Sequence, residues 1–326
     1  MSPNQSIEDI AYKCLNGTQV QLNSVSIAVY ALVFTAGLIL NLIALVVFFR
    51  YTRARSHTTV YMTNLTLADL ILVTTLPLRI SYHSGFSELS QGLCEATGVV
   101  LLINMYGSIF LLTCISFDRC LAVCFPLSSR VQEGRKRAPL VCLGVWFLTV
   151  GASLPNYILV KGRESRKNCF MSFPLYTTQK NAVALTLTVG FGIPLAIMVL
   201  SSWGLLRAIS RSTAAQTADL VDSRKIQRMI VISLVVFLVC FLPYHLTLGL
   251  MYLYSGNPEI FPCALVITYH YSLMVACLNA MLDPLVYYFT TETFRREVDM
   301  DAVRRMWPMG SHSSDGNNRS QAPLNS

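Results

Sequence analysis

The sequence predicts an all-α membrane protein, a bundle of seven transmembrane helices with a short amphipathic helix after the seventh. Three observations favour this class. Of the 326 residues, 53% are hydrophobic and only 13% are charged, against about 25% charged in soluble globular proteins. Apolar runs longer than the roughly 18 residues that cross a bilayer as a helix recur along the chain. Lysine and arginine cluster after alternate runs, as expected of cytoplasmic loops.

Each apolar run predicts one membrane helix. Prolines lie within or near five of the runs, at positions 77, 155, 194, 243 and 284. They are compatible with membrane helices, because neighbouring helices satisfy the carbonyl groups that a proline frees. We therefore expect the bundle to occupy residues 25–289. The runs cover residues 25–49, 60–82, 96–123, 140–158, 182–206, 229–254 and 264–289.

The positions of the basic residues predict the orientation in the plasma membrane. Clusters follow the first, third, fifth and seventh runs, which places those loops in the cytoplasm and the amino terminus outside. The net charge of +8 then reflects topology and attraction to anionic membrane lipids, and it does not argue for nucleic-acid binding. We expect residues 1–24 to be an extracellular tail, in which Asn4 and Asn16 begin glycosylation motifs.

The segment after the bundle divides into two parts. Residues 290–305 place Phe294 and Val298 on one side of a helix and arginines on the other, which predicts an amphipathic helix on the inner membrane surface. Residues 306–326 are polar and rich in Gly, Ser and Asn, a composition typical of a disordered cytoplasmic tail.

Four of the ten cysteines fall on the predicted outer side, where disulfides form and persist. Four cysteines allow three pairings. Cys94 opens the third span and Cys169 lies in the longest outer loop, which favours a bond between them. A bond between Cys14 and Cys263 would tie the tail to the top of the seventh span. The alternative, that these cysteines are free or paired otherwise, stays open at this point.

Two acidic residues inside predicted spans, Asp69 and Asp283, are candidates for function, because an ionisable group inside a membrane is costly. Asp69 can be a structural carboxylate that accepts hydrogen bonds from Asn41 and other polar groups. Together with Ser108, Asn279 and Asp283 it can instead bind Na⁺, since all of these offer oxygen ligands. Apart from this allosteric cation, no cofactor is expected.

Arg79, near the outer end of the second span, needs an anionic partner because arginine stays charged in proteins. It can extend to the outer interface, or it can anchor an anionic ligand. Basic residues of the second outer loop are either solvated or attract anions collectively: Lys161, Arg163, Arg166 and Lys167. Other candidate ligand contacts are Tyr82, His83, Tyr106, Tyr244 and His245, although His245 can equally be a packed core residue.

The ordered set of motifs resembles the rhodopsin-like G-protein-coupled receptors. The resemblance covers residues 24–296, and its motifs fall in the right order on successive spans. They are Asn41 in "GLILN", "LADL" around Asp69, Cys94, "DRC" from Asp118 to Cys120, Trp146 in "GVW", Pro194, "CFLPYH" and "DPLVYYF". Phe241 and Asp283, with "NMYGSI" and "LPLRISY", are similar to the branch that holds lysophosphatidic acid and nucleotide receptors, and the lysophosphatidic acid type is the most similar.

This resemblance implies a receptor that binds an extracellular anionic ligand, with lysophosphatidic acid as the leading candidate and Arg79 on its phosphate. Nucleotides, small carboxylates and a decoy receptor that does not signal are the alternatives. The resemblance implies a heterotrimeric G protein as the inner partner, with arrestin and receptor kinases. It also implies that Asp118 restrains Arg119 at rest. The residues expected at the G-protein groove are Asp118, Arg119, Pro126, Leu127, Arg228 and Tyr287.

Three other classes fit the sequence poorly. The seventh run contains no lysine for a retinal Schiff base. No internal repeats with paired broken helices, typical of secondary transporters, are recognisable. The chain also has no HExxH, GxSxG or phosphate-loop motif, so no enzyme activity is expected.

Overall fold

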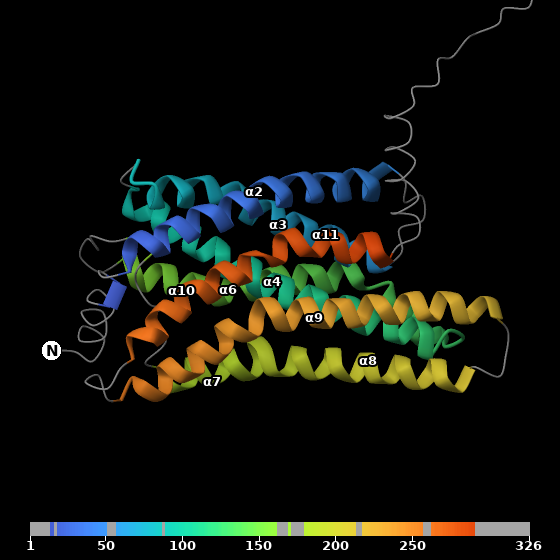
Figure 1. Ribbon diagram of the computed structural model, residues 1–326. Helices are drawn as coiled ribbons and strands as arrows, with labels where there is room; N and C mark the ends of the chain where they lie inside the picture. Colours follow the sequence, from blue (N-terminus) through green and yellow to red (C-terminus); the bar gives the residue numbers. More distant parts are fainter. Residues whose placement is uncertain are drawn as a thin grey trace, which may run out of the picture.

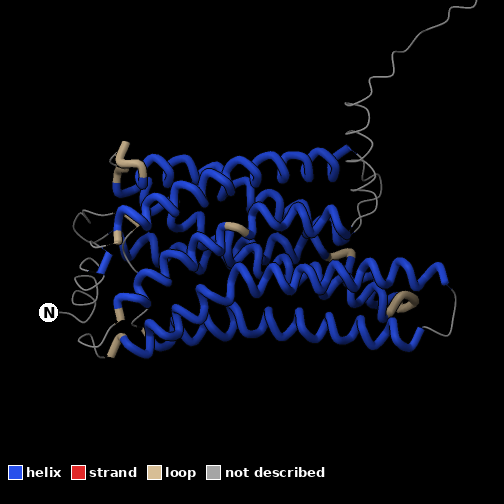
Figure 2. The backbone as a smooth tube through the Cα atoms, viewed as in Figure 1, coloured by secondary structure: helices blue, strands red, loops and turns tan. Residues whose placement is uncertain are grey.

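The computed structural model describes residues 14–15, 18–50, 57–86, 89–161, 169–170, 179–212, 217–256 and 262–290. For residues 155–161, 209–212, 217–225 and 287–290 it describes the backbone alone. Long helices run roughly side by side along the molecule (Figures 1 and 2). In chain order they are α2 (Gln19–Arg50), α3 (His57–His83), α4 (Gln91–Cys124), α5 (Ser129–Arg135), α6 (Ala138–Lys161), α7 (Lys180–Leu187), the π-helical turn η2 (Thr188–Gly192), α8 (Ile193–Ser212), α9 (Thr217–Tyr254), α10 (Cys263–Cys277) and α11 (Asn279–Thr290).

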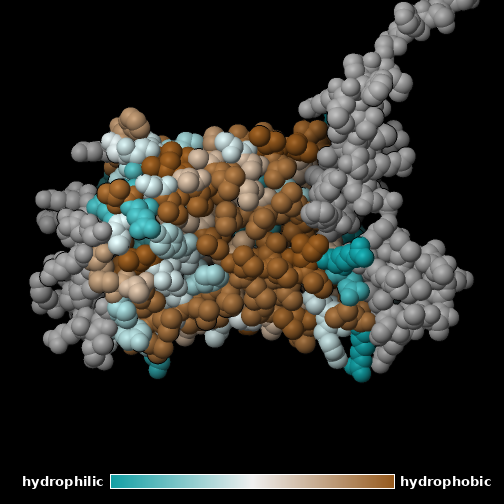
Figure 3. Space-filling view, in the orientation of Figure 1, coloured by the Kyte–Doolittle hydropathy of each residue, from teal (hydrophilic) through white to brown (hydrophobic). Residues whose placement is uncertain are grey.

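The predicted membrane bundle is confirmed in its main features. Within the described residues, six helices are long and apolar enough to cross a membrane, or seven if α5 and α6, which meet at 47°, form one span. On the face shown in Figure 3, hydrophobic surface covers much of the bundle and hydrophilic surface gathers toward its two ends. The first helix begins at Gln19, six residues before the expected start at residue 25. The expected amphipathic helix and tail, residues 291–326, lie outside the described residues.

Proline removes a backbone hydrogen bond from each of two spans. Pro194 has no N–H, and just before it the chain forms the π-helical turn η2, in which Ile193 donates to the carbonyl of Thr188. In the last span, Pro284 cannot donate to the carbonyl of Ala280, four residues earlier. Asn41 Nδ2 on α2 takes over this role and donates to the Ala280 carbonyl at 2.7 Å. The helix α11 is therefore held to α2 by a polar side chain.

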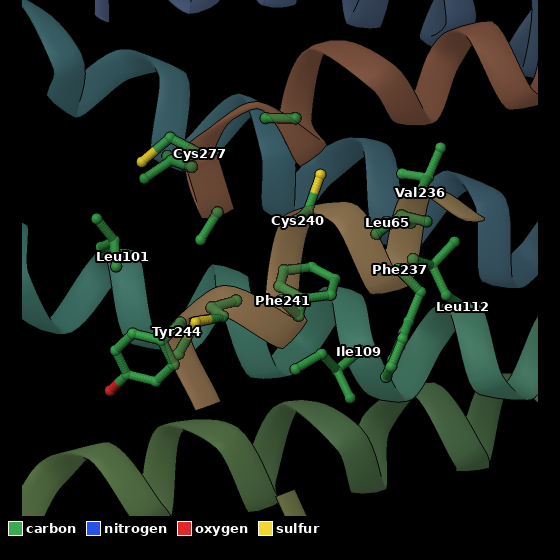
Figure 4. Close-up of a cluster of buried hydrophobic side chains, with 14 of the residues drawn as sticks. Leu65, Leu101, Ile109, Leu112, Val236, Phe237, Cys240, Phe241, Tyr244 and Cys277 are labelled. Atoms are coloured by element: carbon green, nitrogen blue, oxygen red, sulfur yellow. The ribbon is translucent and has the colours of Figure 1, made fainter. Parts of the chain in front are cut away.

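The core of the bundle is aromatic and aliphatic. Phe237, Phe241 and Tyr244 on α9 are fully buried, and they lie near Ile109 on α4 (Figure 4). Phe237 and Phe241 meet edge to face at 5.5 Å between ring centroids. The core around α9 is thus built from large aromatic side chains.

Two disulfides join segments at one end of the bundle. Cys94 at the start of α4 bonds to Cys169, and Cys14 bonds to Cys263 at the start of α10. This is the pairing favoured from the sequence. The first bond fixes Phe170, the residue after Cys169, at the end of the bundle where Arg79 lies.

Candidate functional site

Arg79 is buried inside the bundle rather than extended to the outer interface. Its residue exposure is 4%, and its Nη2 donates to the Thr97 carbonyl of α4 at 3.0 Å. The guanidinium lies over the ring of Phe170 at 4.4 Å and over that of Tyr30 at 5.9 Å. Among the described residues, no carboxylate forms an ion pair with it. Its Nε is buried without a hydrogen-bond partner, so this cation still has a donor to offer.

Phe170 covers this cation in an unusual backbone conformation. Its φ is +61°, a region that costs a non-glycine residue about 1–2 kcal/mol. Its ring also contacts Tyr82 edge to face at 5.3 Å and stacks with His83 at 6.2 Å. His83 in turn pairs through Nδ1 with Asn23 Oδ1 at 2.9 Å. The sequence-predicted residues Tyr82 and His83 therefore lie around Arg79 through Phe170, a residue that the sequence reasoning did not single out.

His245 forms the centre of a second group of rings, deeper along α9. Its Nδ1 lies 2.8 Å from the Phe241 carbonyl, while its Nε2 is buried with no partner. Its ring stacks on Phe191 at 4.4 Å and meets Tyr106 at 6.0 Å and Tyr244 at 5.1 Å, both edge on. His245 is therefore both packed and able to accept one hydrogen bond through Nε2, if its Nδ1 carries the proton.

A polar cluster occupies the middle of the bundle. Asn104 donates to Asp69 Oδ1 at 3.0 Å, and Asn279 donates to Asp283 Oδ2 at 2.8 Å. The other oxygen of each aspartate, Ser108 Oγ and Asn279 Oδ1 are buried without a partner. Such a set of oxygen atoms suits a small hard cation. The described residues contain no group of three or more His, Cys, Asp or Glu that could hold a metal ion, so a cation here would depend on neutral oxygens as well.

Two details of this cluster differ from the sequence-based expectation. Asn41 does not bond Asp69, because its amide donates to the carbonyls of Gly37 at 2.9 Å and Ala280 at 2.7 Å. The partner of Asp69 is Asn104, which the sequence reasoning missed. The available signal was the spacing of Asn104 and Ser108, four residues apart and therefore on one face of an otherwise apolar helix.

At the opposite end, Asp118 on α4 is paired, although not with Arg119 as expected. Arg135, the last residue of α5, donates through Nε to Asp118 Oδ1 at 2.7 Å and through Nη2 to Oδ2 at 3.1 Å. Thr58 Oγ1 on α3 donates to Oδ2 at 2.5 Å. Arg119 Nε is buried without a hydrogen-bond partner. Cys120, the third residue of the "DRC" motif, packs close to Gly204 on α8, where an added Cβ would lie 3.3 Å from its sulfur.

The remaining predicted residues divide into three sets. Pro126 and Leu127 follow α4 and are exposed, Leu127 to 97%, and Arg228 is exposed on α9. Lys161 and Tyr287 belong to α6 and α11, but only their backbones are described. Asn4, Asn16, Arg163, Arg166 and Lys167 lie outside the described residues.

Comparison with known proteins agrees with this arrangement. The family model "7 transmembrane receptor (rhodopsin family)" matches residues 40–287. Lysophosphatidic acid receptor 6 of Mus musculus is 34% identical over 293 residues, which cover 85% of this chain and 84% of that protein. Lysophosphatidic acid receptor 4 of Homo sapiens is 36% identical over 289 residues, with 86% and 78% covered.

A third relative covers even more of the chain. Lysophosphatidic acid receptor 5 of Bos taurus is 35% identical over 315 residues, which cover 90% of this chain and 83% of that protein. Together with the match over residues 40–287, these similarities confirm what the motif order predicted. The chain belongs to the rhodopsin family of seven-transmembrane receptors, a family of receptors rather than enzymes.

Proposed function

We propose that the protein binds an extracellular anionic lysophospholipid, with lysophosphatidic acid as the leading candidate, and activates heterotrimeric G proteins in response. The observation that carries this proposal is Arg79, a buried guanidinium with no carboxylate partner among the described residues and with a free Nε. A buried charge without a paired ion is costly. A phosphate group supplies the missing charge and accepts several charge-assisted hydrogen bonds at once.

Similarity to named receptors supports the lipid over other anions. The three relatives above carry the name lysophosphatidic acid receptor, at 34% to 36% identity over most of the chain. The phosphate would enter beside Arg79, and Phe170, which now lies 4.4 Å over the guanidinium, would have to move aside. The glycerol hydroxyl of such a lipid offers a donor that the free Nε2 of His245 can accept.

Signalling follows as a shift between two packings of the bundle. A ligand that reaches His245 changes the ring contacts around it, and Pro243 lies on α9 two residues away. Because Pro243 removes one backbone hydrogen bond from α9, the inner part of this helix could swing outward there and open a groove for the Gα subunit near Arg119. We propose that arrestin and receptor kinases act at the same face. A Na⁺ ion between Asp69 and Asp283 would favour the resting packing.

The proposed orientation, with the amino terminus outside, is supported by the cysteines. Both disulfides lie at one end of the bundle, whereas Cys120 and Cys124 at the other end are free thiols with sulfur atoms 3.7 Å apart. Disulfides persist in the oxidising extracellular space and thiols in the cytosol. An epitope tag at the amino terminus should therefore be labelled on intact cells.

The proposed function is tested by exposing cells that express the receptor to three probes. These are lysophosphatidic acid, a nucleoside diphosphate and a small carboxylic acid, with activation of a panel of Gα subunits as the measurement. We expect a response to the lipid. A response to the nucleotide or the carboxylic acid alone would contradict the assignment of lysophosphatidic acid as the ligand. Binding of the lipid without Gα activation would indicate a decoy receptor.

Substitution of Arg79 tests the anchor itself. Loss of one partner of a buried charge pair costs about 2–5 kcal/mol, so Arg79→Ala should lower lipid potency at least about thirtyfold. Arg79→Lys keeps the charge but loses the forked donors, so its lipid potency should lie between that of the wild type and that of Arg79→Ala. The matched control is Lys180→Ala, because Lys180 is an exposed cation at the same end of the bundle. If the lipid is equally potent on Arg79→Ala and Lys180→Ala at equal surface expression, Arg79 is not the anchor of the phosphate.

A further inference from the structure

In this structure three of the roughly four acceptor sites of the Asp118 carboxylate are taken, which leaves too few for a second two-pronged contact. Arg135 contacts both of its oxygens, at 2.7 and 3.1 Å, and Thr58 donates to Oδ2 at 2.5 Å. The side chains of Arg135 and Asp118 are only 13% and 5% exposed, so solvent screens the pair weakly. A two-pronged contact from arginine to carboxylate is among the stronger and more directional polar contacts in proteins.

Arg135 is distinct among the basic residues of its loop. Arg130, Lys136 and Arg137 are exposed, and Lys136 makes only a long contact of 4.0 Å to the exposed Glu133. Among these four basic residues, Arg135 is the one that is partly buried. It is the last residue of α5, and its side chain reaches Asp118 on α4. This burial ties the second inner loop to the end of the bundle through a single ion pair.

Arg119 is left without the partner that its neighbour in sequence would supply. Its Nε is buried with no hydrogen bond, and neither ion pair among the described residues involves it. Asp118 can satisfy one guanidinium fully, so Arg135 and Arg119 are rivals for the same carboxylate. While Arg135 holds Asp118, Arg119 keeps its donors for another acceptor.

We propose that Arg135 is a positioning residue for G-protein coupling, which acts by taking Asp118 away from Arg119. In the coupling-competent packing Arg135 holds the carboxylate, α5 is docked, and Arg119 is available to carbonyl groups of a Gα helix. In the resting packing Asp118 returns to Arg119 and α5 is released. This inference rests on the proposed coupling to G proteins, and it adds a residue and a direction to that coupling.

The test is a cycle of variants in purified receptor reconstituted in lipid discs, with nucleotide exchange on added Gα heterotrimer as the readout. Lysophosphatidic acid and agonist-free buffer are the two conditions. Arg135→Ala should lower exchange at least about fivefold, the lower end of typical coupling between sites. In the Asp118→Asn background the same substitution should have no effect, because no carboxylate remains for Arg119 to rejoin. The matched control, Arg137→Ala, removes an exposed arginine two residues away and should leave exchange unchanged.

The cycle separates this role from a structural one. If Arg135 merely anchored the loop, its removal would lower exchange equally in both backgrounds, and the proposal would be wrong. Increased exchange in Arg135→Ala would also overturn the proposal, because Arg135 would then restrain the receptor. Unchanged exchange would overturn it as well, because Arg135 would then have no role in coupling. Should Arg135→Ala fail to fold, Arg135→Lys serves in its place, and the loss should again disappear with Asp118→Asn. Absence of exchange in wild-type receptor with every Gα and both conditions would instead contradict the proposed function.

Discussion

Replacement of Gly190 by alanine tests how closely α4 packs on the π-helical turn. A Cβ built at Gly190 would lie 3.0 Å from Cε1 of Tyr106 and 3.5 Å from Cδ1. Ordinary van der Waals contact begins at about 3.4 Å, so the ring or the turn must move by a few tenths of an ångström. Overpacking of this kind costs about 1–3 kcal/mol. Alanine gains up to about 1 kcal/mol over glycine in a helix, which leaves a net loss of about 0–2 kcal/mol.

Gly107 is the matched control for this substitution. It follows Tyr106 on α4, and a Cβ there would meet nothing within 4 Å. Gly107→Ala should therefore keep the helical gain of about 1 kcal/mol without the clash. The two variants should differ by about 1–3 kcal/mol, which corresponds to several degrees in unfolding temperature for a chain of this size.

Buried thiols provide the assay. Cys142, Cys240 and Cys277 are free and buried, so a thiol-reactive dye reports unfolding of the purified receptor on heating. Gly190→Ala should unfold at a lower temperature than Gly107→Ala, and its response to agonist should weaken because Tyr106 contacts His245. An unfolding temperature for Gly190→Ala equal to or above that of Gly107→Ala would refute the close packing inferred here.

Three further outcomes are expected. Asn41→Ala leaves the Ala280 carbonyl without its donor and should destabilise the receptor by about 1–3 kcal/mol, measured as a lower unfolding temperature; no change would show that another group satisfies this carbonyl. Phe170→Leu removes a ring contact to Arg79 worth about 0.5–2 kcal/mol and should speed lipid association in a binding time course, whereas an unchanged rate would mean that Phe170 does not obstruct entry. Replacement of choline chloride by sodium chloride should raise the unfolding temperature of the wild type but not of Asp69→Asn, and an equal rise in both would place sodium elsewhere.

The long helices could be predicted from the sequence because hydropathy averages over many residues. The position of each break could not, because it depends on which neighbour satisfies a freed carbonyl. Pro284 marks a disturbance in the last span, but only the fold shows that Asn41, more than two hundred residues earlier, supplies the donor. Likewise Pro194 could be read from the sequence, whereas the π-helical turn before it and the closeness of Gly190 to Tyr106 could be seen only in the fold.

The residues of the candidate sites also divide into those that the sequence reveals and those that only the fold reveals. Residues such as Arg79 and Asp69 could be singled out because a charge within an apolar run is conspicuous. Arg135 was hidden among several basic residues of one loop, and only its burial against Asp118 distinguishes it. Phe170 was hidden for another reason, since its place over Arg79 depends on a backbone conformation with φ of +61°, which an aromatic residue seldom adopts.

Polar contacts make α3 and α4 a single stiff unit. They occur at three levels along the pair, and hydrogen bonds fix both distance and direction. A slide of one helix past the other would break several at once. The contacts are Arg79 with the Thr97 carbonyl, Asp69 with Asn104, and Thr58 with Asp118.

The ring contacts of α9 are of another kind, and we expect this difference to decide which ligands activate. Phe237 and His245 stack on Phe191 at 5.4 and 4.4 Å, and apolar contacts, being non-directional, can be exchanged at little cost. A ligand held only by Arg79 contacts the stiff unit and meets the same surroundings in both packings, so it shifts no equilibrium however tightly it binds. A ligand that also reaches His245 favours one packing. Methyl phosphate, which carries the phosphate group without the glycerol hydroxyl or the acyl chain, should therefore displace lysophosphatidic acid without activating Gα, and full activation by methyl phosphate would contradict this division of the bundle.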